Sequence, residues 1–177
     1  MSQNLDKNTL AVILYFISRL DGVLGKTHLQ KLLFLTDLLA IKKLKEPVTA
    51  LEFRRYKHGP YAQSVDIYTS NLVKKGFIEV KEFPLYSIPN KTYTRYYLKK
   101  STPIKKDVIL SLIGPEKLIV VDEVVDSFGN LGLRNLLDFI YDLEVIKSTK
   151  NNSLLDLAKT LKENPNTKDE DAEELPF

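Results

Sequence analysis

The sequence contains 177 residues, of which 44% are hydrophobic and 28% are charged, with 7 Gly, 8 Pro and neither Cys nor Trp. This length and these fractions are typical of a soluble protein with one folded domain, and they exclude collagen-like and wholly disordered chains. Because there is no Cys, a disulfide framework, a thiolate metal site and a thiol nucleophile are excluded, and a cytoplasmic location is favoured.

The formal net charge of +3 conceals an asymmetry along the chain. Residues 1–106 carry 19 Lys or Arg against 8 Asp or Glu, whereas residues 107–177 carry 7 against 15. Such a division indicates an acidic partner, a nucleic acid or contact between the two halves. The longest apolar run, residues 10–17, is far shorter than the roughly 20 residues of a membrane span, and no signal-peptide pattern accompanies it, so we expect no membrane partner.

Two helices and a short third segment are predicted first. One helix is expected over residues 7–19, and a second over residues 27–44, with Thr27 as its N-cap. The second is apolar on nearly every side and should form the buried centre of the domain. Its polar residues left for a binding role are Gln30, Lys31 and Asp37. A short segment then begins at Pro47, with Thr49 and Glu52 spaced as a capping box.

A third helix is predicted over residues 61–75, with Pro60 suited to its first turn and Gly76 to its end. Two strands rich in aromatic and β-branched residues are expected over residues 77–83 and 92–98. The order of three helices followed by two strands is that of a winged helix, in which the β-ribbon forms the wing.

The second half is predicted to be helical over residues 115–128, 133–146 and 153–162, with acidic polar faces. We therefore expect a mainly α fold with a small antiparallel β-ribbon. Its parts are a winged-helix-like region over residues 1–106, a helical C-terminal subdomain over residues 107–163 packed on it, and a disordered acidic tail over residues 164–177.

Two segments carry a family resemblance. Residues 28–34 (HLQKLLF), followed by Glu52-Phe53 and then by residues 56–60 (YKHGP), resemble the Panacea domain, a family that includes SocA-like antitoxins and phage-associated proteins. Tyr56 stands where Trp is frequent in that family, and His58 stands where Tyr is common. The resemblance implies a helical fold with a small β-ribbon, no catalysis, and a protein-binding role such as neutralising a toxin or presenting it to a protease.

The segment around Gly-Pro is also the predicted partner-binding surface, because exposed Tyr side chains beside a rigid turn make good interface anchors. The partner is expected to be a protein, for example a toxin. The candidate residues are Arg54, Arg55, Tyr56, Lys57, His58, Gly59, Pro60 and Tyr61.

Motifs for catalysis or cofactor binding are missing from the sequence, including the Ser nucleophile elbow, the phosphate-binding loop and the dinucleotide fingerprint. His28 and His58 have no partners at metal-ligand spacing. We expect a protein that is not an enzyme and that uses neither a cofactor nor a metal.

Nucleic-acid binding is the alternative function. A winged helix places its third helix in the major groove and its wing on the backbone, and the first half of this chain is basic. At the start of the third helix, however, Asp66 would repel phosphate, which favours non-specific or single-stranded binding over sequence reading. The candidate residues are Arg54, Arg55, Lys57, Lys74, Lys75, Lys91, Tyr93 and Arg95.

The C-terminal tail resembles the acidic tip of single-stranded DNA-binding proteins, which ends in Ile/Leu-Pro-Phe. The resemblance implies a second partner, such as a replication or repair protein, that receives the aromatic end and the charges. The tail has two other possible roles, masking the chain's own basic face or only maintaining solubility. The docking residues would be Asp169, Glu170, Asp171, Glu173, Glu174, Leu175, Pro176 and Phe177.

Overall fold

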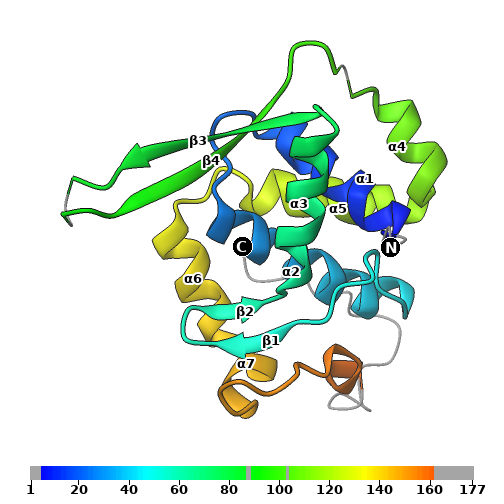
Figure 1. Cartoon of the computed structure of the whole chain (residues 1–177). Coiled ribbons are helices and arrows are strands. Elements are labelled where there is room, and N and C mark those ends of the chain that lie inside the picture. The colour runs from blue at the N-terminus through cyan, green and yellow to red at the C-terminus, as the bar shows by residue number, and fades with distance from the viewer. Residues whose placement is uncertain (1–4, 87–88, 103, 162–177) are drawn as a thin grey trace.

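The computed structural model describes residues 5–86, 89–102 and 104–161, and shows a mainly α protein with two small antiparallel sheets (Figure 1). The helices are α1 (Lys7–Arg19), α2 (Lys26–Leu44), α3 (Ser64–Lys74), α4 (Lys106–Ile113), α5 (Pro115–Phe128), α6 (Leu133–Asp142), α7 (Glu144–Ser148) and the 3-10 helix η1 (Leu157–Leu161). The strands are β1 (Arg54–Tyr56), β2 (Gly59–Tyr61), β3 (Ile78–Pro84) and β4 (Thr92–Leu98). The predicted fold class is confirmed.

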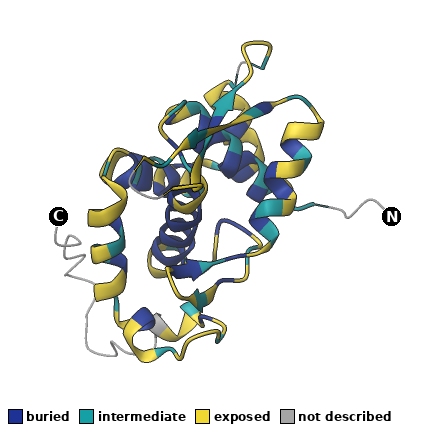
Figure 2. Cartoon of the chain, turned by 60° about the vertical axis from the view of Figure 1, so that its left-hand side comes forward, coloured by how far each residue is buried: buried dark blue, intermediate teal, exposed yellow. Residues whose placement is uncertain are grey.

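Helix α2 is the centre of the molecule, as its apolar pattern predicted. Every residue from His28 to Ile41 is buried, and the other elements surround this helix (Figure 2). The core around it continues from α1 through α5 and α6, so the two halves of the chain share one hydrophobic core. Phe34 of α2 meets Phe53 edge to face, with 5.6 Å between the ring centroids.

The predictions for the ends of α2 need two corrections. The helix begins at Lys26 with Gly25 as its N-cap, so Thr27 lies within it. The segment that follows does not form the helix that a capping box at Thr49 predicted. The reason is that the Thr49 hydroxyl donates to the buried Asp37 carboxylate at 2.5 Å, and the Thr49 amide donates to the same carboxylate at 2.8 Å. Burial raises the pKa of Asp37 to about 7, against the lowering effect of these donors.

Strands β1 and β2 form a tight hairpin that was not predicted from the sequence. Arg54 pairs with Tyr61 and Tyr56 with Gly59, so Pro60 belongs to a strand and not to the first turn of α3. Gly59 has φ of +82°, in the left-handed region that favours glycine, and this lets the chain reverse at once after His58.

Strands β3 and β4 form the predicted ribbon, in register from Ile78 opposite Leu98 to Pro84 opposite Thr92. The ribbon extends away from the helical body (Figure 1). Its base is fixed to the loop between α1 and α2, since the Tyr96 amide donates to the Leu24 carbonyl at 2.9 Å.

The C-terminal helices match the prediction only in part. Helix α5 has the predicted bounds, but the helix expected over residues 133–146 is divided at Leu143, whose ψ of 132° is extended. In the helix predicted over residues 153–162, the described residues 153–161 contain only the 3-10 helix η1, and α4 was not predicted. Opposite charges join the halves, as Lys43 binds Glu123 at 2.6 Å and Arg19 binds Asp122 at 3.0 Å.

Candidate functional site

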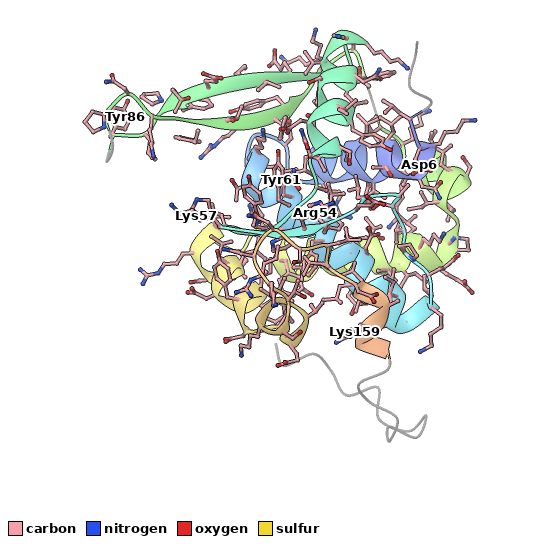
Figure 3. The ribbon with its side chains drawn as sticks, turned by 60° about the horizontal axis from the view of Figure 1, so that its bottom comes forward. Asp6, Arg54, Lys57, Tyr61, Tyr86 and Lys159 are labelled. Atoms are coloured by element: carbon pink, nitrogen blue, oxygen red, sulfur yellow. The ribbon has the colours of Figure 1, made fainter. Side chains whose placement is uncertain are left out.

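A cleft of about 490 Å³ opens between the N-terminal half of α2, the β1–β2 hairpin and the start of α3. It brings together several residues of the predicted partner-binding segment with polar residues of the two helices. The lining residues are Lys26, Thr27, Gln30, Lys31, Tyr56, His58, Gly59, Tyr61, Gln63 and Asp66. Figure 3 shows Arg54 and Tyr61 on this hairpin and Lys57 at its outer end.

Two neighbouring polar residues of α2 fix the hairpin. The side-chain amide of Gln30 donates to the Ala62 carbonyl at 3.0 Å and accepts from the Ala62 amide at 2.9 Å. Lys31 Nζ donates to the Pro60 carbonyl at 2.8 Å. The prediction that Gln30 and Asp37 are free for binding is therefore wrong, because both are buried and each makes at least two hydrogen bonds within the protein. Lys31 is also buried, but among the described residues its Nζ has a single acceptor.

Lys31 is the unusual residue of the cleft. It is only 2% exposed, and burial lowers the pKa of its ammonium to about 8. Within the described part of the chain, no carboxylate lies within 4.0 Å of its Nζ. A Cβ at Gly59 would lie 3.5 Å from Lys31 Cε and 3.7 Å from Nζ, so the glycine backbone lies close to the end of the lysine side chain.

The opposite wall holds a hydrogen-bonded carboxylate. Asp66 Oδ2 accepts from Lys26 Nζ at 2.9 Å and from the Tyr61 hydroxyl at 3.0 Å. The hydrogen bond to Asp66 raises the pKa of Lys26, whereas burial and then the same carboxylate raise the pKa of Tyr61. The Tyr61 ring lies 5.8 Å from that of Tyr56, which is 53% exposed at the mouth of the cleft.

A C-terminal segment, residues 149–155, holds the hairpin from the side of β1. The sequence did not predict this contact. The Arg55 amide donates to the Ser153 carbonyl at 2.9 Å, and the Asn152 amide donates to the Arg55 carbonyl at 2.7 Å. The guanidinium groups of Arg54 and Arg55 donate to the carbonyls of Asn152 and Thr149. The residues joined by these contacts lie almost a hundred positions apart in the sequence, so no local sequence pattern could predict them.

The nucleic-acid candidates lie on separate elements. Arg54, Arg55 and Lys57 belong to the hairpin, Lys74 and Lys75 lie at the end of α3, and Lys91, Tyr93 and Arg95 belong to the ribbon side of the molecule. The free ends of hairpin and ribbon, marked by Lys57 and Tyr86, project on the same side (Figure 3).

Arg95 makes internal contacts on the ribbon. Its guanidinium lies 5.6 Å from the Phe83 ring centroid and 5.3 Å from that of Tyr93, and it donates to the Gly22 carbonyl at 3.1 Å. The tail candidates, residues 169–177, lie outside the described residues.

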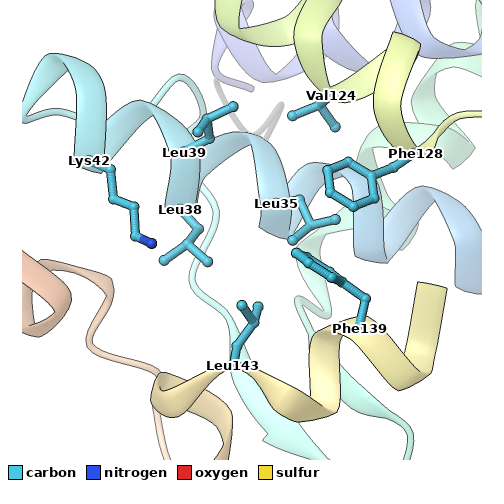
Figure 4. A pocket seen from close by; sticks show the side chains of 8 residues that line it. All are labelled: Leu35, Leu38, Leu39, Lys42, Val124, Phe128, Phe139 and Leu143. Atoms are coloured by element: carbon cyan, nitrogen blue, oxygen red, sulfur yellow. The ribbon is translucent and has the colours of Figure 1, made fainter. Parts of the chain in front are cut away.

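An apolar slot between α2, α5 and α6 is too small for a ligand. Its volume of about 20 Å³ is that of a single water molecule, which makes it a packing gap of the core. Leu38, Phe139 and Leu143 are among its lining residues, with Lys42 at its edge (Figure 4).

No cluster of three or more His, Asp or Glu side chains with metal-binding geometry occurs in the described ranges. His28 is buried in α2 with Nε2 3.4 Å from the Phe128 carbonyl, and burial lowers its pKa. His58 lies apart from it, exposed at the hairpin turn.

The sequence matches the model of a known protein family. The model of the family described as antitoxin SocA-like, Panacea domain matches residues 29–146, which include most of α2, the hairpin, the ribbon and helices α3 to α6. The chain belongs to this family. A search of curated proteins finds no match to the sequence. Among the described helices, none has both the length and the apolar character needed to cross a membrane.

Proposed function

We propose that this protein is an antitoxin-like interaction module that binds a partner protein through the cleft and the β1–β2 hairpin. Membership of the SocA-like Panacea family supports a protein-binding role of this kind. The observation that carries the proposal is the cleft itself, where the exposed Tyr56 lies on a hairpin held from two sides and two cations, Lys26 and Lys31, come from α2. The partner would be a toxin that this protein neutralises directly or delivers to a protease, in the cytoplasm of a prokaryote or its phage, without catalysis.

The rigidity of the hairpin supports this role. Tyr56 lies on β1 and His58 in the turn of a hairpin that is hydrogen-bonded to α2 on one side and to residues 152–155 on the other. A side chain whose backbone is already fixed loses less conformational entropy on binding, so more of its contact free energy appears as affinity. Tyr is among the residues that most often dominate such interfaces.

Co-expression with the protein encoded by the neighbouring gene, followed by affinity purification, tests the proposal. We expect a complex that survives high salt, and Tyr56→Ala should weaken it by about tenfold or more, the effect of an interface anchor. Tyr86→Ala is the matched control, because Tyr86 is 96% exposed at the end of the ribbon, away from the cleft. Equal loss in both variants, or in neither, would count against the cleft as the interface.

The alternative proposal is a winged-helix protein that binds nucleic acid without sequence preference, or single strands, through the ribbon. The observation in its favour is the aromatic and cationic surface of the ribbon, where Phe83 and Tyr93 are stacked at 5.5 Å and Lys81 lies 4.6 Å from the Tyr97 centroid. In that case affinity for DNA should fall steeply with salt, and Tyr86→Ala should weaken binding more than Tyr56→Ala.

The acidic tail has a separate proposed role. Residues 169–177 would recruit a second partner such as a replication or repair protein, or would cover the basic face of residues 1–106. Their five acidic residues favour either contact with a basic surface. If the tail covers the basic face, its removal should change the protein's own binding of nucleic acid. If the tail only recruits a second partner, its removal should leave that binding unchanged.

A further inference from the structure

We infer that the cleft contains a carboxylate-binding subsite, with Lys31 Nζ at its floor, that receives an Asp or Glu side chain of the partner protein. The inference rests on the proposed function and adds the chemical group that the partner must supply. Three features of the cleft support it: a buried ammonium with unused hydrogen-bond donors, a surplus of positive charge among the lining residues, and a volume of about 490 Å³.

The ammonium of Lys31 has hydrogen-bonding capacity to spare. A lysine has three N–H donors, and within the described residues only the Pro60 carbonyl accepts from Nζ, at 2.8 Å. The side chain is 2% exposed, yet it lines the cleft, so its remaining donors have little water to bond. A buried ammonium whose N–H donors are not all used is strongly stabilised by an anion that can reach it.

The cleft provides no anion of its own for Lys31. Its titratable lining groups are Lys26, Lys31, Tyr56, His58, Tyr61 and Asp66. The one carboxylate among them, that of Asp66, is already hydrogen-bonded to Lys26 and to the Tyr61 hydroxyl. Helix α6, which contacts the hairpin, brings an apolar group, Ile140, near Gly59. The local charge is therefore positive, which favours an acidic ligand.

The shape of the cleft favours a side-chain carboxylate over a nucleic-acid phosphate. The cleft of about 490 Å³ has Lys31 in its lining, and the rings of Tyr56 and Tyr61 provide an apolar wall for the stem of an acidic side chain. A phosphodiester within a strand would need several free cations along its path, and Lys26 is already paired with Asp66.

A small probe tests the subsite without the partner. The full chain, with ¹³C-labelled lysine, is titrated with N-acetyl-glutamate methylamide and, in parallel, with the uncharged N-acetyl-glutamine methylamide. We expect the glutamate probe to shift the Lys31 Cε signal saturably, with a dissociation constant in the millimolar range, and to raise the pKa of Lys31. The glutamine probe should do neither.

Variants identify the site. Lys31→Met and Lys31→Gln lack the Lys31 signal, so binding is followed in wild type and variants by the Cε signal of Lys26, the other lysine in the cleft lining. Both variants should abolish the saturable binding, and Lys31→Gln retains a donor for the Pro60 carbonyl if Lys31→Met fails to fold. Lys42→Met is the matched control, since Lys42 is an exposed lysine of the same helix outside the cleft, and it should bind the probe normally. No saturable shift, an equal response to both probes, or equal competition by inorganic phosphate would overturn the carboxylate assignment.

The partner complex separates this inference from the proposed function. Lys31→Gln should weaken a complex purified by co-expression by tenfold or more, and replacing one Asp or Glu of the partner should have no further effect in that variant. If the probe binds but no protein partner exists, the proposed function fails and the subsite stands. If a partner binds wild type and Lys31→Gln equally, the subsite is overturned and the proposed function stands.

Discussion

Lys31→Met should change how the stability of this protein depends on pH. In the unfolded chain the ammonium has its ordinary pKa of 10.5, whereas in the folded protein burial lowers that pKa to about 8. Between these two values the unfolded state binds more protons than the folded state. The free energy of unfolding of the wild type should therefore rise as the pH increases through this window.

The two pKa values set the size of the effect. One pKa unit corresponds to about 1.4 kcal/mol, so the contribution of Lys31 should increase stability by about 2.5 kcal/mol between pH 7 and 10. The physical origin is the cost of keeping a desolvated ammonium charged with one carbonyl as its acceptor. Deprotonation removes this cost, and Lys31→Met removes the titrating group while it keeps most of the side-chain volume.

Urea unfolding followed by far-UV circular dichroism at pH 7, 8, 9 and 10 measures the effect. Wild type and Lys42→Met should gain stability over this range relative to Lys31→Met. Burial raises the pKa of Tyr15, Tyr61 and Tyr96, and this lowers stability only above about pH 10, equally in all three proteins. Parallel curves for wild type and Lys31→Met would refute the picture of a buried, unpaired lysine.

Three further changes have defined outcomes. Gln30→Leu should lower the free energy of unfolding by about 3 kcal/mol in urea titrations, because it leaves both buried backbone groups of Ala62 without their partner; a loss below about 1 kcal/mol would contradict the two-point clamp. Asn71→Ala should raise stability by about 1 kcal/mol, since Asn71 Oδ1 is buried without a hydrogen bond in the described structure and Ala is the better helix former; thermal unfolding checks the sign. Deleting residues 169–177 should strengthen binding of single-stranded DNA several-fold at low salt and have no effect at high salt, measured by fluorescence anisotropy, and an unchanged salt slope would contradict masking by the tail.

Local patterns in the sequence were sufficient for several elements. The bounds of α1 and α5 match the prediction, and the ribbon occurs where the sequence is rich in β-branched and aromatic residues. Each of these signals depends on residues a few positions apart, in the period of one helix or one strand. The central position of α2 was also predictable, because a helix without a polar face must be covered on all sides.

The errors occur where distant residues compete with local preference. Pro60 and Thr49 both carry local signals for the start of a helix, yet the Pro60 carbonyl accepts from Lys31 of α2 and Thr49 binds Asp37 of the same helix. A buried carboxylate with several donors outweighs a capping box, which is worth about 1 kcal/mol. Likewise, Leu143 ends α6 although the amphipathic pattern continues.

The sequence by itself determined the mainly α fold, the β-ribbon and the family, and it singled out residues 54–61 as a candidate binding segment without predicting that they form a hairpin. It did not determine what Gln30 and Lys31 do, because their partners, Ala62 and Pro60, lie 32 and 29 positions away. Only the tertiary structure buried these two polar residues against the hairpin and opened the cleft beside it. The physical reason is that burial and charge pairing depend on which distant groups surround a side chain, and the residue type and its nearest neighbours do not contain that information.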